Sequence, residues 1–249
     1  MSEGQIVDFS LPVIGRKQRT LKTSIGCVGT GLNTGRRVAM TMKPAAPGHG
    51  VRFRRIDLGP GCGDIPARYD MVRDTRFGIS IANPQTPELA VSSIEHLMAA
   101  LAGCGVHNLL VEVDGPELPV LDGSADPFVF LLDCAGTVTQ DATRATVRIA
   151  RPVRVEAGTG FAELAPGIYA REVALSFDFP IPAVGPDTLS VTITPELFRH
   201  ELARARRFTF AHELAELQSA GLGRGVNLGN TIIIDESGVR NPGGLRMPD

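Results

Sequence analysis

Residues 92–103 of the chain read SSIEHLMAALAG, and this stretch has the periodicity of a helix packed against a core. Its large apolar side chains recur at positions i, i+3, i+4 and i+7, which places them on one stripe of a helix. These side chains are Ile94, Leu97, Met98 and Leu101. The stretch therefore predicts a helix over about 92–102 that is buried along one side.

Glu95 and His96 lie off this stripe, in the first turn of the predicted helix. The face that carries them is continued by small residues, which would let a ligand or another backbone approach: Ala99, Ala100 and Gly103. A helix N-terminus favours a carboxylate anion and a neutral imidazole, and the neutral imidazole is the form that binds metals. The pattern Ser92-x-x-Glu95 is also a capping box. The residues alone leave both interpretations open, a catalytic Glu-His pair or a helix cap.

Short strand patterns lie on both sides of this helix and then recur in the second half of the chain. In the first half we predict strands at 20–25, 37–44, 51–55 and 108–113, and a second helix at 127–135. This helix is expected to begin with Asp126 and Pro127 and to stop at Gly136. After a polar linker at 137–143 we predict strands at 145–155, 160–164, 172–178 and 189–194, and helices at 195–206 and 210–220. The fold class expected is α+β, with two similar two-layer sheet-plus-helix domains over 19–139 and 144–249.

The composition restricts the class of protein. The 249 residues are 43% hydrophobic and 21% charged, as in a globular protein with a sizeable core, and the net charge of −2 argues against a nucleic-acid binder. No apolar run reaches the length of about 18 residues expected of a membrane helix, although contact with a lipid surface stays open. Four cysteines without a C-x-x-C pair and the lack of a signal peptide favour a cytoplasmic protein with reduced thiols.

Other catalytic motifs are incomplete. His200-Glu201 and His212-Glu213 each begin like a zinc-protease H-E-x-x-H helix, but Arg204 and Glu216 stand where the second histidine would be. There is no G-x-S-x-G elbow for a serine hydrolase. These histidines are better interpreted as parts of solvated charged faces.

The ordered motifs of the chain resemble the UDP-3-O-acyl-N-acetylglucosamine deacetylase family, the zinc amidases of lipid A synthesis. The resemblance runs from Gln18 to Asp249. It rests on the segments QRTL (18–21), GLNTG (31–35), RRIDL (54–58), VRDT (72–75), SIEHL (93–97), PELP (116–119), DGSA (122–125), VRVE (153–156), RARRF (204–208) and GLR (244–246).

The resemblance implies a site between two α+β domains. His96 would be a zinc ligand and Glu95 the general base that takes a proton from water. The substrate implied is a UDP-linked acylated glucosamine, with Phe208 in contact with its sugar ring and Arg207 as a second substrate-binding residue. A monomer is expected, with no nucleic-acid partner.

The chain departs from the family pattern at several places. Asn33 replaces a histidine, Gly78 stands where cysteine is common, and Arg207 replaces a threonine that contacts the substrate or its intermediate. The family's remaining zinc ligands and general acid lie beyond the position of Asp249, so the second domain is expected to be incomplete. We therefore expect these 249 residues to bind zinc weakly, to lack deacetylase activity, and to leave 231–234 without an apolar partner. A non-catalytic paralogue that binds a nucleotide sugar, a lipid or a protein is the alternative.

Overall fold

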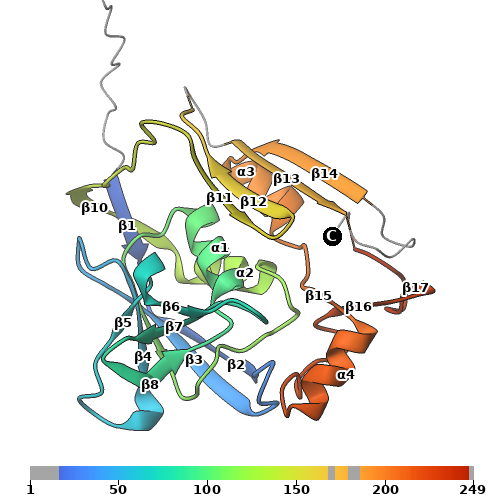
Figure 1. Ribbon diagram of the computed structural model, residues 1–249. Helices are drawn as coiled ribbons and strands as arrows, with labels where there is room; N and C mark the ends of the chain where they lie inside the picture. Colours follow the sequence, from blue (N-terminus) through green and yellow to red (C-terminus); the bar gives the residue numbers. More distant parts are fainter. Residues whose placement is uncertain (1–16, 168–171, 179–185, 247–249) are drawn as a thin grey trace, which may run out of the picture.

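The structure is a computed structural model that describes residues 17–167, 172–178 and 186–246. It has the predicted α+β class, with helices and several sheets (Figure 1). The largest sheet has five strands in the order β2 (Ile25–Thr30), β3 (Arg37–Pro44), β9 (Leu109–Val113), β4 (Val51–Arg55) and β5 (Ile65–Pro66). The central strand β9 is antiparallel to β3 and parallel to β4. The predicted strand bounds at 37–44 and 51–55 are confirmed.

Two helices share one apolar core with this sheet, α1 (Glu95–Cys104) and α2 (Asp126–Ala135). The predicted stripe of α1 is confirmed, because Ile94, Leu97 and Leu101 are buried and Met98 packs against the same core. The second helix begins with Asp126-Pro127 and ends at Gly136, as the sequence predicts. This core holds the catalytic candidates of α1 on a rigid element.

Residues 137–143 form a strand, β10 (Thr137–Thr143), so the predicted linker is wrong. It pairs antiparallel with β1 (Lys17–Leu21). The β-branched residues Thr137, Val138 and Thr139 favour extended structure, although the segment 137–143 is polar as a whole. The buried Asn108 amide donates to the side chains of Gln18 and Gln140 at 2.7 Å each, which ties the two strands together. The prediction of one strand at 20–25 is also wrong, since the chain bends after β1 before β2 begins.

A three-stranded sheet lies beside the start of α1. It consists of β6 (Val72–Asp74), β7 (Ser80–Asn83) and β8 (Thr86–Val91), all antiparallel. Short 3-10 turns precede it, η1 (Ile56–Leu58) and η2 (Tyr69–Met71). The loop from Asp74 to Ser80 therefore runs close to the first turn of α1.

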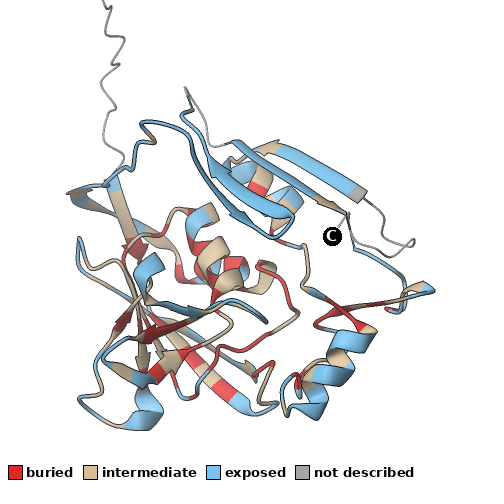
Figure 2. Cartoon of the chain, viewed as in Figure 1, coloured by how far each residue is buried: buried red, intermediate tan, exposed pale blue. Residues whose placement is uncertain are grey.

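The second half of the chain contains two separate hairpins and a small mixed sheet. The hairpins pair β11 (Val153–Ala157) with β12 (Gly160–Leu164), and β13 (Glu172–Asp178) with β14 (Pro186–Thr192). Most of their described side chains are exposed (Figure 2). The predicted strand 145–155 thus begins only at Val153. The predicted helix 195–206 is α3 (Pro195–Leu197), continued by the π-turn η3 (Phe198–Leu202).

The small sheet has the order β15 (Phe208–Phe210), β16 (Ile232–Asp235), β17 (Gly238–Val239), and α4 (Ala211–Ser219) connects its parallel pair. Ile232 and Ile234 are buried in a cluster with Phe210, against which Val239 packs. The expectation that 231–234 would have no apolar partner is therefore wrong. Its cluster is nevertheless much smaller than the core around α1.

Candidate active site

The first turn of α1 places Glu95 beside the loop that precedes β7. Ser93 has a left-handed backbone, with φ 59°, and Ile94 is the N-cap without a side-chain capping bond. A capping box requires its glutamate at the third position of the helix, but Glu95 is the first helical residue. Its Oε2 accepts a hydrogen bond from the backbone N–H of Ile79 at 2.9 Å. The capping-box interpretation is wrong, and the Glu95 carboxylate is left facing the loop.

Gly78 permits this close approach. Its φ is +124°, which favours glycine, and a Cβ at this position would lie 2.9 Å from Glu95 Oε1. A cysteine or any larger residue would have to shift either the loop or the carboxylate. Gly78, which stands where the family commonly has cysteine, therefore leaves space for the Glu95 carboxylate.

His96 follows on the same turn and is partly buried. Burial lowers the pKa of its imidazole, the charge of Arg207 acts in the same direction, and the negative charges of Glu95 and Asp122 oppose both. The net direction is downward, so the imidazole is neutral near pH 7. A neutral imidazole can accept a proton or bind a metal.

Arg207 reaches this pair from the segment between η3 and β15. Its backbone N–H donates to Gly123 O at 2.9 Å, and its carbonyl oxygen accepts from Ile232 N at 2.9 Å. Burial lowers the pKa of its guanidinium, while the negative charges of Glu95 and Glu117 raise it. Its Nε is buried and has no hydrogen-bond partner within the described residues. The structure thus brings a cation close to the two carboxylates.

Phe208, the next residue, has a different environment. Its ring is 45% exposed and stands edge-on to that of Phe210, with centroids 5.9 Å apart. Phe210 in turn stacks on His212 at 5.8 Å. Phe208 therefore belongs to a short aromatic row at the edge of the small sheet.

A buried carboxylate that the sequence analysis missed holds the turn at 31–35. Glu117 is 2% exposed and accepts hydrogen bonds from the backbone N–H groups of Asn33 at 2.9 Å and Thr34 at 2.7 Å. A Cβ on Gly31 would collide with it. The only signal in the sequence was a charged residue between the two prolines of PELP, in a stretch otherwise apolar.

Asp122 and Arg246 join the end of the described chain to the same area. Arg246 donates to Asp122 Oδ2 at 2.5 Å, and Ser124 Oγ donates to Asp122 Oδ1 at 2.8 Å. Burial raises the pKa of the Asp122 carboxyl, but the bonds from Arg246 and Ser124 outweigh it, so the net shift is downward. Arg246 was not predicted as a site residue, because nothing local in the sequence connects it to position 122.

The described residues do not form a complete zinc site. A catalytic zinc takes three protein ligands and a water. No group of three or more His, Cys, Asp or Glu side chains within 17–167, 172–178 and 186–246 is placed to hold a metal. Near His96, Asp122 is engaged by Arg246 and Glu95 by Ile79. The donor set present does not fit a catalytic zinc.

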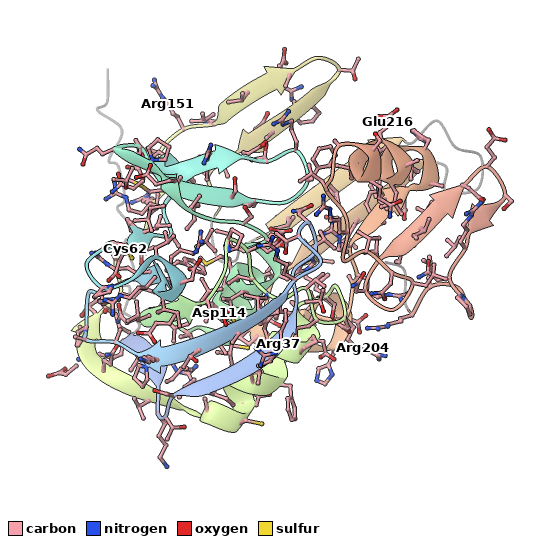
Figure 3. All side chains as sticks on the ribbon, turned by 90° about the horizontal axis from the view of Figure 1, so that it is seen from below. Arg37, Cys62, Asp114, Arg151, Arg204 and Glu216 are labelled. Carbon is pink, nitrogen blue, oxygen red and sulfur yellow. The ribbon has the colours of Figure 1, made fainter. Side chains whose placement is uncertain are left out.

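One cavity of the described chain lies away from Glu95 and His96. It measures about 540 Å³ and lies beneath the loop 59–64. Two of its arginines are already neutralised, Arg54 by Asp64 and Arg55 by Asp57. Figure 3 shows Cys62 of this loop well apart from Arg204, which precedes Arg207 in the chain. These two arginines of the cavity are therefore already paired with carboxylates, and the cavity lies apart from the segment that carries Arg207. The Glu95–His96 area remains the candidate functional site.

None of the helices in the described part of the chain has the length and apolarity needed to cross a bilayer.

Comparison with known proteins gives consistent matches. Residues 18–249 match the family described as LpxC: UDP-3-O-acyl N-acetylglycosamine deacetylase. A UDP-3-O-acyl-N-acetylglucosamine deacetylase of Idiomarina loihiensis is 42% identical over 234 residues, which is 94% of this chain and 76% of that relative. The protein of the same name from Haemophilus influenzae strain 86-028NP is 42% identical over 235 residues, with the same coverage. That of Anaeromyxobacter sp. is 41% identical, covering 93% of this chain and 74% of the relative.

Proposed function

This chain belongs to the UDP-3-O-acyl-N-acetylglucosamine deacetylase family, and from that membership we propose that its substrate is the UDP-linked, 3-O-acylated N-acetylglucosamine of lipid A biosynthesis. The reaction proposed is hydrolysis of the N-acetyl group in the cytoplasm. The similarity that supports it extends over 94% of the chain and includes both halves.

Glu95 is the proposed general base. Hydrolysis of an amide requires that a water lose a proton as it attacks the carbonyl carbon, and a positioned carboxylate can accept that proton. The observation that carries this assignment is the Glu95 carboxylate itself, which caps no helix and is oriented by the Ile79 N–H at 2.9 Å. Its position in the first turn of α1 keeps it on a rigid element.

Zinc is implied by the family, and His96 is the proposed ligand for it. A bound zinc would polarise the acetamide carbonyl and activate water. Because the described residues supply no complete ligand set, we derive no catalytic step from the metal.

Arg207 and Phe208 are the proposed substrate contacts. Arg207 presents a buried Nε–H without an acceptor in the described chain, and a guanidinium pairs well with phosphate oxygens. Phe208 offers a half-exposed ring to the sugar. The diphosphate and the glucosamine ring are therefore assigned to adjacent residues.

A binding protein without catalysis is the second candidate. The observation that favours it is Arg207, whose buried Nε has no hydrogen-bond partner within the described residues and suits a phosphate oxygen of a nucleotide sugar. A site that holds the diphosphate in this way can retain a nucleotide sugar without hydrolysing it.

Acetate release and calorimetry separate the two candidates. The purified chain is assayed with the substrate, with and without added zinc, beside the variant Glu95→Gln. For the hydrolase we expect acetate release that falls by about 10²–10⁴-fold in the variant. For the binding protein we expect no release above that of the variant, but a saturable binding isotherm for the nucleotide sugar.

A matched pair of arginine variants tests the substrate contact. Arg207→Thr should weaken nucleotide-sugar binding, whereas Arg204→Thr, an exposed position three residues earlier, should leave it unchanged. Equal isotherms for both variants would remove Arg207 from the site. Absence of both acetate release and binding would contradict both candidate functions.

A further inference from the structure

A second, smaller cavity lies at the other end of α1, away from Glu95. It measures about 170 Å³. Its apolar wall includes Val51, Met98, Leu101 and Val106, and its polar side is formed by His107 and Arg144. Pockets for drug-sized ligands measure about 300–1,000 Å³, so this cavity suits a molecule of only a few heavy atoms. The residues of α1 that line it are Met98, Leu101 and Ala102, so it opens along the helix beyond the turn that carries Glu95 and His96.

His107 presents a hydrogen-bond donor without an acceptor. Its Nδ1 accepts a hydrogen bond from the backbone N–H of Arg19 at 3.0 Å, so the proton of the neutral ring is on Nε2. Nε2 is buried and has no partner within the described residues. A buried donor of this kind is costly unless an acceptor from outside the chain satisfies it.

The surroundings of His107 are positive. Arg144 is exposed and makes no ion pair within the described chain. Among the described residues, the Arg19 guanidinium donates to two neutral oxygens, the carbonyl of Cys104 and the hydroxyl of Thr137. Burial, then Arg144 and then Arg19 lower the pKa of the His107 imidazole, which places both guanidinium groups near it. The Arg19 guanidinium also lies beside the cavity lining, because a Cβ on Gly105 would be 3.6 Å from its Nη1.

We propose that this cavity binds a short-chain carboxylate. The carboxylate accepts the Nε2–H of His107 and pairs with Arg144, and its aliphatic tail packs against Val51, Met98 and Leu101. An inorganic oxyanion would satisfy the same donors but would leave the apolar wall without a partner, so the wall selects an organic acid. The site is independent of the Glu95–His96 site and of the function proposed for it.

Calorimetric titration with sodium butyrate tests the site. We expect a saturable isotherm with one site per chain, and weaker binding of sodium sulfate at equal ionic strength. Arg144→Gln should weaken butyrate binding about tenfold, the usual consequence of losing a charge-assisted hydrogen bond. The control Arg148→Gln removes an exposed arginine four residues away and should change nothing.

A plugging variant and an NMR readout complete the test. Ala102 is an exposed residue of the lining, so Ala102→Phe should fill the cavity without disturbing the core and should abolish binding. Butyrate should raise the pKa of His107 in the wild-type chain, since an anion stabilises the imidazolium. A non-saturable isotherm, equal losses in Arg144→Gln and Arg148→Gln, or sulfate binding as tightly as butyrate would each overturn the proposal.

Discussion

The strands β3 and β11 have the same kind of alternating sequence but opposite environments. In β3, Val38, Met40 and Met42 are at most 3% exposed, because α1 and α2 complete the core beside their sheet. In β11, Val153 and Val155 also share one face, but they are 51% and 65% exposed. Alternation thus identifies which face of a strand is apolar, and only tertiary packing determines whether that face is buried.

Paired truncations should show the largest difference between two regions, the first formed by β1 to β10 (residues 17–143) and the second by β11 to β17 (the described residues from 153 on). Leu97→Ala removes a fully buried side chain of α1 and should lower the free energy of unfolding by about 2–5 kcal/mol. Val155→Ala, on the exposed hairpin, should change it by less than about 0.5 kcal/mol. Urea denaturation measures both. A cost of several kcal/mol for Val155→Ala would mean that the hairpin face is covered in solution, and the contrast between the regions would fail.

The contact between Gly103 and Phe198 should show the next largest effect, because it joins the two regions. Phe198, from η3, is buried in the core of the first region, and a Cβ at Gly103 would lie 2.1 Å from its ring. Gly103→Ala should therefore cost about 1–3 kcal/mol, although alanine is normally the better helix former. In a Phe198→Leu background the same change should cost clearly less. Equal costs in both backgrounds would show that the ring does not rest on Gly103.

Arg246 should have a smaller effect that depends on pH. The pKa of Asp122 lies below its usual value in the folded state, so this carboxylate stabilises the fold above its unfolded pKa of about 3.8 and stops doing so as the pH falls through the folded value. Arg246→Gln should lower the free energy of unfolding by about 1 kcal/mol at pH 7. The difference from wild type should shrink as the pH falls below about 3.8, because the folded-state pKa lies lower still. Thermal denaturation between pH 2.5 and 7 measures it, and a difference that is constant with pH would contradict the pairing.

The ion pair between Arg199 and Asp133 should contribute least. It is bidentate, at 2.7 and 2.9 Å, and also joins the two regions, but its side chains are 35% and 55% exposed. Arg199→Gln should cost about 0.2–1 kcal/mol, and less at high salt. Denaturation in 0.05 and 1 M sodium chloride tests this. A larger, salt-independent loss would assign the role of Arg199 to its hydrogen bond with Cys104 Sγ.

Local sequence patterns predicted those features of helices and strands that depend on residues a few positions apart. The stripe of α1, the Asp-Pro start and glycine end of α2, and the bounds of β3 and β4 all follow from periodicity and capping. Glu95 and His96 were singled out as candidates from the same local pattern. The capping-box interpretation was wrong because Ser93 adopts a left-handed backbone. The motif Ser92-x-x-Glu95 carries no information about that backbone conformation.

Long-range partners could not be predicted from local pattern. Glu117 is buried because the turn at 31–35 donates two N–H groups to it, and Arg246 meets Asp122 across 124 positions of sequence. The resemblance singled out Arg207, but only the structure places its charge near Glu95, His96 and Glu117. In each case the decisive contact joins segments far apart in the chain.

The pairing of β1 with β10 has a consequence for how the protein folds during synthesis. Lys17 lies opposite Thr143, so this outermost strand pair of the first region forms through a contact that spans more than half of the chain. Bringing two segments so far apart in sequence together costs conformational entropy before their pairing can stabilise the fold. Contacts between distant segments therefore slow folding. The growing chain must therefore hold the α1 core without its outermost strand pair until residue 143 has been made. We expect the first region to reach its full stability late in translation, when the first hairpin of the second region is about to follow.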